Sequence, residues 1–214
     1  MKLLIFAGQT LTAAQVHRIL PHAEVRPPIE RGDAHRALAE GANVLGVVDG
    51  AFLDDAAVTT TELVDAMRVG VRVFGSSGVG AIRAAELDHL GMTGCGLIYE
   101  RIKSGPYFRD DALGLVGVSL IELDLTLARL VLQKKVPAAL AREILAHGAA
   151  LHFSKRTFEQ LLGTFRAGDS KAAKACALIE KHLVRQKTLD GQALLITVRD
   201  ALATTARANL LLRG

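Results

Sequence analysis

The chain has no tryptophan and few other aromatic residues, and no apolar run approaches the ~20 residues that a membrane-spanning helix needs. A transmembrane segment is therefore not expected. The two cysteines, Cys95 and Cys176, stand far apart without CxxC or histidine spacing, which argues against a zinc site or a disulfide framework. Two unpaired thiols fit a reducing, cytoplasmic setting.

The seven histidines have no partner at metal-ligand or triad spacing, so the sequence predicts neither a metal site nor a Ser-His-Asp arrangement. Charge is unevenly placed. Residues 1–120 hold 11 Lys and Arg against 14 Asp and Glu, a net −3, while residues 121–214 hold 15 against 8, a net +7. The basic residues are scattered at helical spacing without aromatic neighbours, which favours a solvated helix face or an acidic protein partner over nucleic acid.

The first hundred residues alternate short apolar runs with helical patterns. Such alternation is typical of βαβ units in a parallel sheet. We therefore predict an α/β fold, a parallel sheet with flanking helices of Rossmann or flavodoxin-like type. The expected strands are 3–7, 23–26, 44–48 and 71–74, with helices over 13–20, 34–41, the segment from 54 to 70, and 79–90.

From residue 119 onward the pattern becomes helical throughout. This change predicts an α/β core over 1–118 and a C-terminal helical region over 119–214. Its expected helices cover 119–135, 137–151, 155–165, 170–187 and 190–212.

Polar and glycine-rich pieces follow each of the four expected strands. Because parallel strands end at one edge of their sheet, these pieces are predicted to meet there, where ligands of such folds bind. They are Gly8–Thr10, Pro27–Asp33, Asp49–Phe52 and Gly75–Gly80.

The piece GSSGVG at 75–80 lies where a strand turns into a helix. Gly75, Gly78 and Gly80 allow a sharp turn and a close backbone approach to a ligand, and the first amides of the helix favour an anion. Ser77 is the leading candidate for a nucleophile beside an oxyanion hole. Alternatively, Ser76 or Ser77 caps the helix.

Charged residues supply further candidates. Asp49 ends an apolar strand, a costly place for a charge unless it is paired or functional. Arg83 either binds a carboxylate at the sheet edge or pairs with Glu86 three residues on. Arg31 and Asp33 belong to a proline-led turn, where they contribute to the site or hold the loop.

The pair Asp110–Asp111 supplies a base, holds a cation or caps a helix. Adjacent carboxylates are weak evidence for a metal, because no further oxygen ligands can be identified. GSSGVG also lacks the Lys-Ser/Thr of a phosphate-binding loop and follows the fourth strand, so a nucleotide-binding domain is the weakest interpretation and no cofactor is expected.

Several motifs, in this order along the chain, resemble the TfuA-like family, proteins found alongside YcaO enzymes in thioamide formation. They are FAGQTL at 6–11, PPIERGD at 27–33, VVDGAF at 47–52, GSSGVGAIRAAEL at 75–87, GMTGCGLIYE at 91–100, Asp110–Asp111, and KRTFEQLL at 155–162. Position 79 departs from the family pattern, with Val where Met is expected.

The resemblance implies a cytoplasmic partner of a YcaO-type enzyme, which replaces a backbone amide oxygen with sulfur. The implied contribution is hydrolysis of the C-terminal thiocarboxylate of a ThiS-like sulfur carrier, which releases sulfide. Ser77 would be the nucleophile or orient water, Asp49 or Asp110 would be the base, and Arg31 and Arg83 would bind the carboxylate end.

The other residues of the four loops, Gly8, Thr10 and Asp33 among them, would line this thiocarboxylate hydrolase site. The alternative is a non-catalytic adaptor that binds or activates the YcaO enzyme. Homo-oligomer formation is compatible with both.

Overall fold

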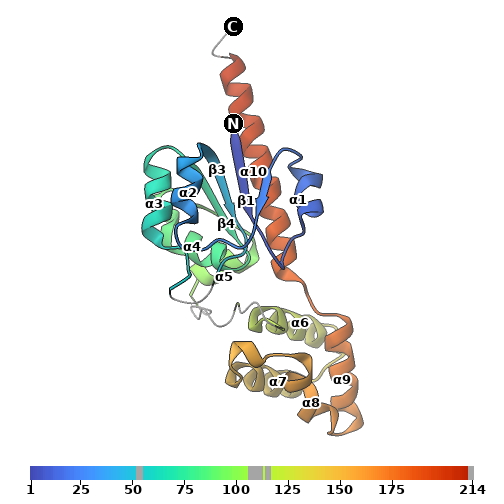
Figure 1. Ribbon diagram of the computed structural model, residues 1–214. Coiled ribbons are helices and arrows are strands. Elements are labelled where there is room, and N and C mark those ends of the chain that lie inside the picture. Colours follow the sequence, from blue (N-terminus) through green and yellow to red (C-terminus); the bar gives the residue numbers. More distant parts are fainter. Residues whose placement is uncertain (52–54, 106–112, 114–116, 212–214) are drawn as a thin grey trace. The chain divides into compact units, whose positions relative to one another are not determined.

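The computed structural model describes residues 1–51, 55–105, 113 and 117–211 (Figure 1). The chain forms two compact units. The first consists of Met1–Pro106 together with Gln186–Gly214, and the second of Tyr107–Arg185. The division differs from the expected one near residue 118, because the last helix belongs with the sheet and not with the preceding helices.

The first unit is built on a five-stranded parallel sheet with the strand order β2-β1-β3-β4-β5. This arrangement confirms the predicted fold class. The fifth strand was not predicted, because its three residues, Thr93–Cys95, carry no apolar run. The strands are β1 Lys2–Phe6, β2 Glu24–Arg26, β3 Ala42–Val47, β4 Arg72–Ser76 and β5 Thr93–Cys95.

The carboxyl ends of these strands lie level with one another. Phe6 of β1 pairs with Val47 of β3, Val47 with Gly75 of β4, and Gly75 with Gly94 of β5. The loops that follow the strands therefore begin at one edge of the sheet, as the sequence predicts.

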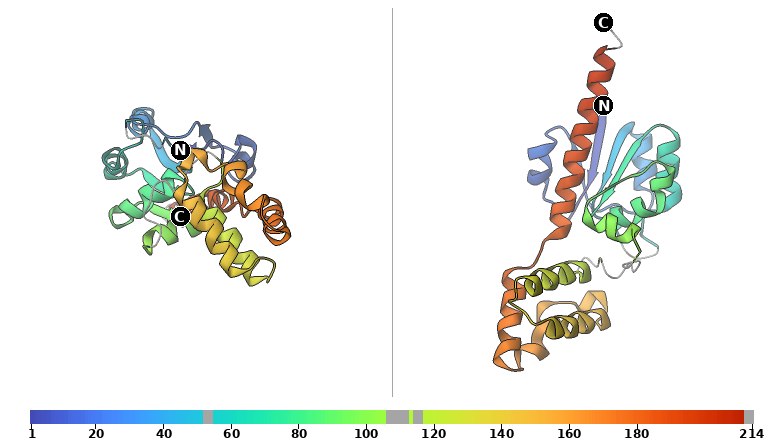
Figure 2. Two further views of the ribbon diagram at one scale, coloured as in Figure 1. Left: turned by 90° about the horizontal axis from the view of Figure 1, so that it is seen from below. Right: turned by 180° about the vertical axis from the view of Figure 1, so that it is seen from behind.

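Helices cover both faces of the sheet (Figures 1 and 2). Helices α1 and α10 lie on one face, while α2, α3 and α4 lie on the other; α5 packs beside β5. Thr12 and Thr59 are the N-caps of α1 and α3 and form capping boxes. In each, the threonine side chain accepts from the backbone amide three residues on, and the side chain of that residue accepts from the threonine amide. The helices of this unit are α1 Ala13–Ile19, α2 Asp33–Ala39, α3 Thr60–Arg68, α4 Val79–Leu87, the 3-10 helix η1 Asp88–Leu90, α5 Leu97–Lys103 and α10 Gln186–Leu211.

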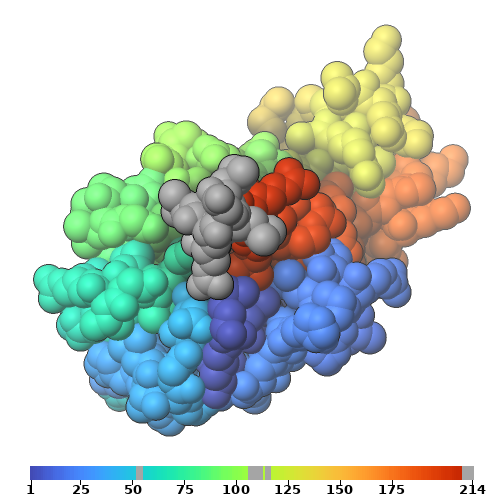
Figure 3. Space-filling model, turned by 90° about the horizontal axis from the view of Figure 1, so that it is seen from above, coloured from blue at the N-terminus to red at the C-terminus, as the bar shows by residue number. Residues whose placement is uncertain are grey.

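Helix α10 completes the core of the first unit. Its side chains Leu194, Leu195 and Val198 are fully buried and pack in one cluster with Leu3 and Ile5 of β1. Seen from above, α10 lies beside the start of the chain (Figure 3). Without this helix, one face of the sheet would expose its apolar side chains to water.

The second unit is helical and has its own apolar core of leucine, isoleucine, valine and alanine side chains. Arg156 is also buried in this unit, and its Nε donates to the carbonyl of Gly148 at 2.9 Å. No helix in the described part of the chain is long and apolar enough to cross a bilayer. The elements are α6 Leu120–Leu132, α7 Ala138–Ala150, the 3-10 helix η3 Phe153–Lys155, α8 Phe158–Arg166 and α9 Ser170–Lys181.

Candidate functional site

The loops that follow the first four strands contact one another at the carboxyl edge of the sheet. The amide of Ile29 donates to the carbonyl of Asp49 at 2.9 Å, and the amide of Ala51 donates back to Ile29 at 3.0 Å. The amide of Gly78 donates to Val48 at 3.2 Å. The predicted meeting of these loops is thus present in the structure.

Asp49 lies fully buried at the centre of this edge. Its Oδ2 accepts hydrogen bonds from the amides of Gly8 at 2.8 Å and Thr10 at 3.0 Å, and its Oδ1 accepts from the Thr10 hydroxyl at 2.6 Å. Strand order reverses between β1 and β3, and the crevice at such a reversal is where doubly wound sheets bind ligands. Asp49 therefore holds the loop after β1 at the expected ligand position.

Ser77 lies between β4 and α4 with a φ of 66°, in the left-handed region that side chains other than glycine rarely adopt. It is fully buried. Its hydroxyl donates to the carbonyl of Lys187 at 2.7 Å and lies 3.2 Å from the Ser76 hydroxyl. Gly78 is the N-cap of α4 and no side chain caps this helix, so the alternative role of Ser76 or Ser77 as a cap is wrong.

The first turn of α10 covers Ser77, and the sequence did not indicate this. Besides the Lys187 carbonyl on Ser77, the Thr188 hydroxyl donates to the carbonyl of Thr10 at 3.3 Å. A Cβ built on Gly191 would lie 3.4 Å from the Ser77 Oγ. Because this turn contacts the loops after both β1 and β4, the hydroxyl of Ser77 is closed off from solvent.

Asp190, from the same turn, binds the start of α5. Its carboxylate accepts from the amides of Leu97 at 3.0 Å and Ile98 at 2.7 Å and from the Gln186 side chain at 2.6 Å. Burial raises the pKa of Asp190, and these donors oppose the rise. A Cβ on Gly96 would meet the Asp190 carboxyl carbon at 2.3 Å, so the two backbones fit only with glycine there.

Gly75, Gly78 and Gly80 of GSSGVG were all predicted to bring the backbone close to a ligand. In the structure, two of them pack against other backbone atoms of the first unit. A Cβ on Gly80 would lie 1.9 Å from the Val47 carbonyl oxygen, and one on Gly75 would lie 2.1 Å from that of Gly80. These two glycines bring α4 against the sheet. A Cβ on Gly78, in contrast, would lie 3.8 Å from Oδ1 of Asp49, so Gly78 is the glycine beside the buried carboxylate.

Arg83 forms the predicted ion pair with Glu86, three residues on in α4. Its Nη1 donates to Glu86 at 2.7 Å and its Nε to the Val58 carbonyl at 3.0 Å. About a fifth of the side chain is exposed, 21%. Among the described hydrogen bonds of Arg83, none reaches Ser77 or Asp49.

Arg31 and Asp33 stand further out on the loop after β2. Arg31 is exposed, and its amide donates to the Ala56 carbonyl at 2.8 Å. Asp33 accepts from the Glu30 amide at 2.7 Å and pairs with Arg36 at 2.5 Å. Asp33 is therefore engaged with its own loop and helix.

Glu62, in α3, has a role at this edge that none of the sequence motifs indicates. It is buried, and its Oε2 accepts from the amide of Gly32 at 2.7 Å, which fixes this loop to α3.

Asp110 and Asp111 lie outside the described residues. Among the residues that the structure does describe, no three His, Cys, Asp or Glu side chains are grouped so as to hold a metal ion.

Cys95 packs in the core of the first unit, and burial raises the pKa of its thiol.

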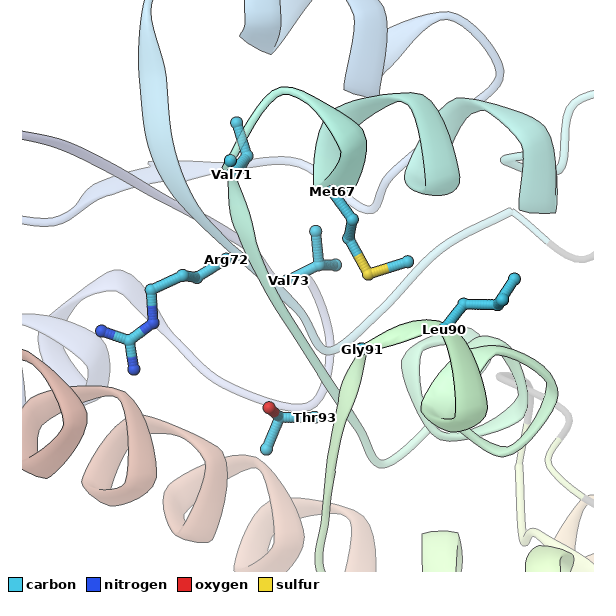
Figure 4. A pocket seen from close by; sticks show the side chains of 8 residues that line it. Met67, Val71, Arg72, Val73, Leu90, Gly91 and Thr93 are labelled. Atoms are coloured by element: carbon cyan, nitrogen blue, oxygen red, sulfur yellow. The ribbon is translucent and has the colours of Figure 1, made fainter.

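A cavity of about 280 Å³ opens at the opposite edge of the sheet, near the start of β4 and β5 (Figure 4). Met67, Val73 and Leu90 contribute apolar side chains to it. The Arg72 guanidinium extends toward α10 and donates to the Ala201 carbonyl at 3.3 Å. Because Arg72 starts a strand whose other end leads to Ser77, this cavity is separate from the candidate site.

The arrangement thus combines a buried carboxylate, a serine in strained backbone and the uncapped start of α4 at one sheet edge. A helix start without a capping side chain or acidic first turn favours a negative charge nearby.

Comparison with protein-family models gives a match to TfuA-like protein over residues 49–157, half of the chain. The matched span includes Asp49, Ser77 and Arg83 but neither the loop after β1 nor α10. No curated protein matches the sequence.

Proposed function

Since the chain belongs to the TfuA-like family, which is associated with YcaO-dependent thioamide formation, we propose that it releases sulfide for a YcaO-type enzyme. The sulfide comes from hydrolysis of the C-terminal thiocarboxylate of a ThiS-like carrier protein.

The backbone of Ser77 is the observation that carries this proposal. A φ of 66° at a strand-to-helix junction resembles the strained turn on which hydrolases present a nucleophilic serine. Such strain persists only where the surroundings impose it. Here the uncapped start of α4 supplies backbone amides of the kind that stabilise an oxyanion.

The reaction proceeds in two balanced steps. The Ser77 oxygen attacks the thiocarboxylate carbon, the C–S bond breaks, and hydrosulfide leaves as the serine ester forms. Water then hydrolyses the ester, restores the serine and yields the carboxylate and a proton. Asp49, the buried carboxylate at the same edge, is the proposed base.

The first turn of α10 must move for this chemistry to occur. The Ser77 hydroxyl donates a hydrogen bond to the Lys187 carbonyl, and Ser77 is fully buried. Displacement of residues 186–191 would release the Ser77 hydroxyl, the carbonyl of Thr10 and the start of α5.

The test is incubation of the purified chain with thiocarboxylated carrier, followed by mass spectrometry of the carrier C-terminus. Hydrolysis replaces sulfur by oxygen and lowers the mass accordingly. Ser77→Gly removes the hydroxyl and suits the positive φ, so it should fold and lose activity. Ser104→Gly, at an exposed serine after α5 and outside the four loops, is the matched control and should stay active. An intact thiocarboxylate with wild-type protein, with and without the YcaO enzyme, would refute the hydrolase.

The second candidate is a non-catalytic adaptor of the YcaO enzyme. The fully buried Ser77, hydrogen-bonded to Lys187, favours it, because the same geometry serves simply to fix α10 on the sheet. An adaptor should increase thioamide formation when inorganic sulfide replaces the carrier, and Ser77→Gly should keep that stimulation. A hydrolase that only supplies sulfide should give no stimulation under these conditions.

A further inference from the structure

The second unit contains a cavity of about 460 Å³ between the end of α6, the start of α7 and the first turns of α9. Four apolar residues and four lysines line it, and no carboxylate is among these described lining residues. The lining residues are Val131, Lys134, Lys135, Val136, Pro137, Ala138, Lys171 and Lys174. We call this the lysine pocket.

The four lysines concentrate positive charge around the lysine pocket. All four lysines are exposed, and none forms an ion pair with a carboxylate of the described residues. Asp169, the nearest acid in sequence to Lys171, accepts from backbone amides at the start of α9. Like charges gathered without a counter-charge repel one another, and an anionic partner relieves that repulsion.

The charge of the whole chain points to the same unit. Residues 107–185 hold 12 Lys and Arg against 8 Asp and Glu, whereas the rest of the chain holds 14 against 14. The net +4 of the protein therefore belongs to the second unit. This excess attracts an acidic partner at long range and raises its rate of association.

Lys134 adds a local observation. Its φ of 56° places it in the left-handed region, just after α6 ends, where glycine is the favoured residue. The amide of Lys134 donates to Val131 at 2.8 Å and that of Lys135 to Leu130 at 2.9 Å, which closes the helix end. A lysine here costs stability relative to glycine but places an ammonium group at the lysine pocket.

We propose that the lysine pocket binds an acidic segment of a partner protein, with an apolar side chain of that segment on the apolar floor. Lysines bind carboxylates as point charges, and the floor of Val131, Val136, Pro137 and Ala138 suits an aliphatic group. The lining contains neither arginine nor aromatic residues among those described, and these are the residues on which nucleic-acid bases stack. The proposal is independent of the hydrolase, since an adaptor needs such a surface equally.

The test is fluorescence anisotropy of the full-length protein with a labelled peptide of alternating Glu and Leu. A Gln-Leu peptide of equal length and a single-stranded oligouridylate are the comparison probes. We expect binding of the Glu-Leu peptide alone, weakened by salt. Equal binding of both peptides would show an apolar surface without charge selection and overturn the proposal, as would binding of the RNA in preference to the acidic peptide or no binding of any probe.

Variants assign the binding to the lysine pocket. The double change Lys171→Gln and Lys174→Gln should weaken peptide binding about 10-fold, because two exposed ion pairs with the peptide are lost. Lys181→Gln, on the same helix outside the pocket, is the matched control and should bind within about 2-fold of wild type. Lys134→Gly should weaken binding about 3-fold while the protein becomes more stable to urea. Wild-type affinity in the double variant would refute the assignment.

Discussion

Substitutions of Asp49 separate its two roles, that of a loop anchor and that of a base. Asp49→Ala removes the acceptor of three hydrogen bonds, from the amides of Gly8 and Thr10 and from the Thr10 hydroxyl. Gly8 is exposed, so its amide can bind water, whereas Thr10 is buried. The amide and the hydroxyl of Thr10 would both lose their acceptor. Each buried donor left without an acceptor costs about 1–3 kcal/mol, so the alanine variant should lose about 2–6 kcal/mol of unfolding free energy.

Asp49→Asn, in contrast, can keep all three contacts. The asparagine oxygen replaces Oδ2 and accepts from both amides, while its NH2 group replaces Oδ1 and donates to the Thr10 oxygen. Neutral hydrogen bonds are weaker than charged ones, but the cost of burying a charge also disappears. We expect a loss of about 1 kcal/mol or less.

The chain lacks tryptophan, so urea unfolding is best followed by far-ultraviolet circular dichroism. The same preparations are assayed for hydrolysis of the carrier thiocarboxylate. If Asp49 is the base, the asparagine variant should be stable and yet roughly 100-fold or more slower. An asparagine variant as unstable as the alanine variant would refute the hydrogen-bond exchange. A stable asparagine variant with full activity would show that Asp49 only holds the loop.

Two further substitutions test how closely glycines pack, one in each unit. Gly80→Ala should cost about 3 kcal/mol of unfolding free energy, because its Cβ would lie 1.9 Å from the Val47 carbonyl oxygen. Gly163→Ala, in α8 with nothing within 4 Å, should instead stabilise the protein by up to about 1 kcal/mol, and both values come from urea unfolding. Burial raises the pKa of Asp190, so the native state binds this proton more tightly than the unfolded chain. The unfolding free energy should therefore fall as pH rises from the ordinary aspartate pKa to the raised native one, and Asp190→Asn should reduce that slope; a steeper slope in the variant would contradict the assignment.

The sequence predicted most of the sheet because its signals are local. The runs at β1 and β3 are nearly continuously apolar, as strands covered on both faces must be. Strand β5 was not predicted, because Thr93–Cys95 is short and contains glycine. Only its pairing with β4 identifies it as a strand. The helix at the end of the chain was predicted, but the layer on which it packs depends on tertiary contacts that no local pattern encodes.

In the candidate site, too, some residues have a local sequence signal and others depend on contacts that the sequence does not show. Asp49 was identified because a charge that ends a buried strand requires partners, and Gly8 and Thr10 supply them. Arg83 could not be assigned, because a contact with Glu86 and a contact with a ligand use the same side chain and spacing. Lys187 acts on Ser77 through its carbonyl, a group that every residue has, so no sequence signal could indicate it.

The position of Lys187 links the two proposals through the covalent chain. The second unit ends at Arg185, and Lys187, whose carbonyl accepts the hydrogen bond from the Ser77 hydroxyl, follows two residues later. A partner bound to the lysine pocket can expose Ser77 only if it binds more tightly to the protein with the first turn of α10 displaced. Peptide affinity should then differ between wild type and Ser77→Gly, which lacks the hydrogen bond to Lys187, whereas equal affinities would show that the pocket and the serine act independently.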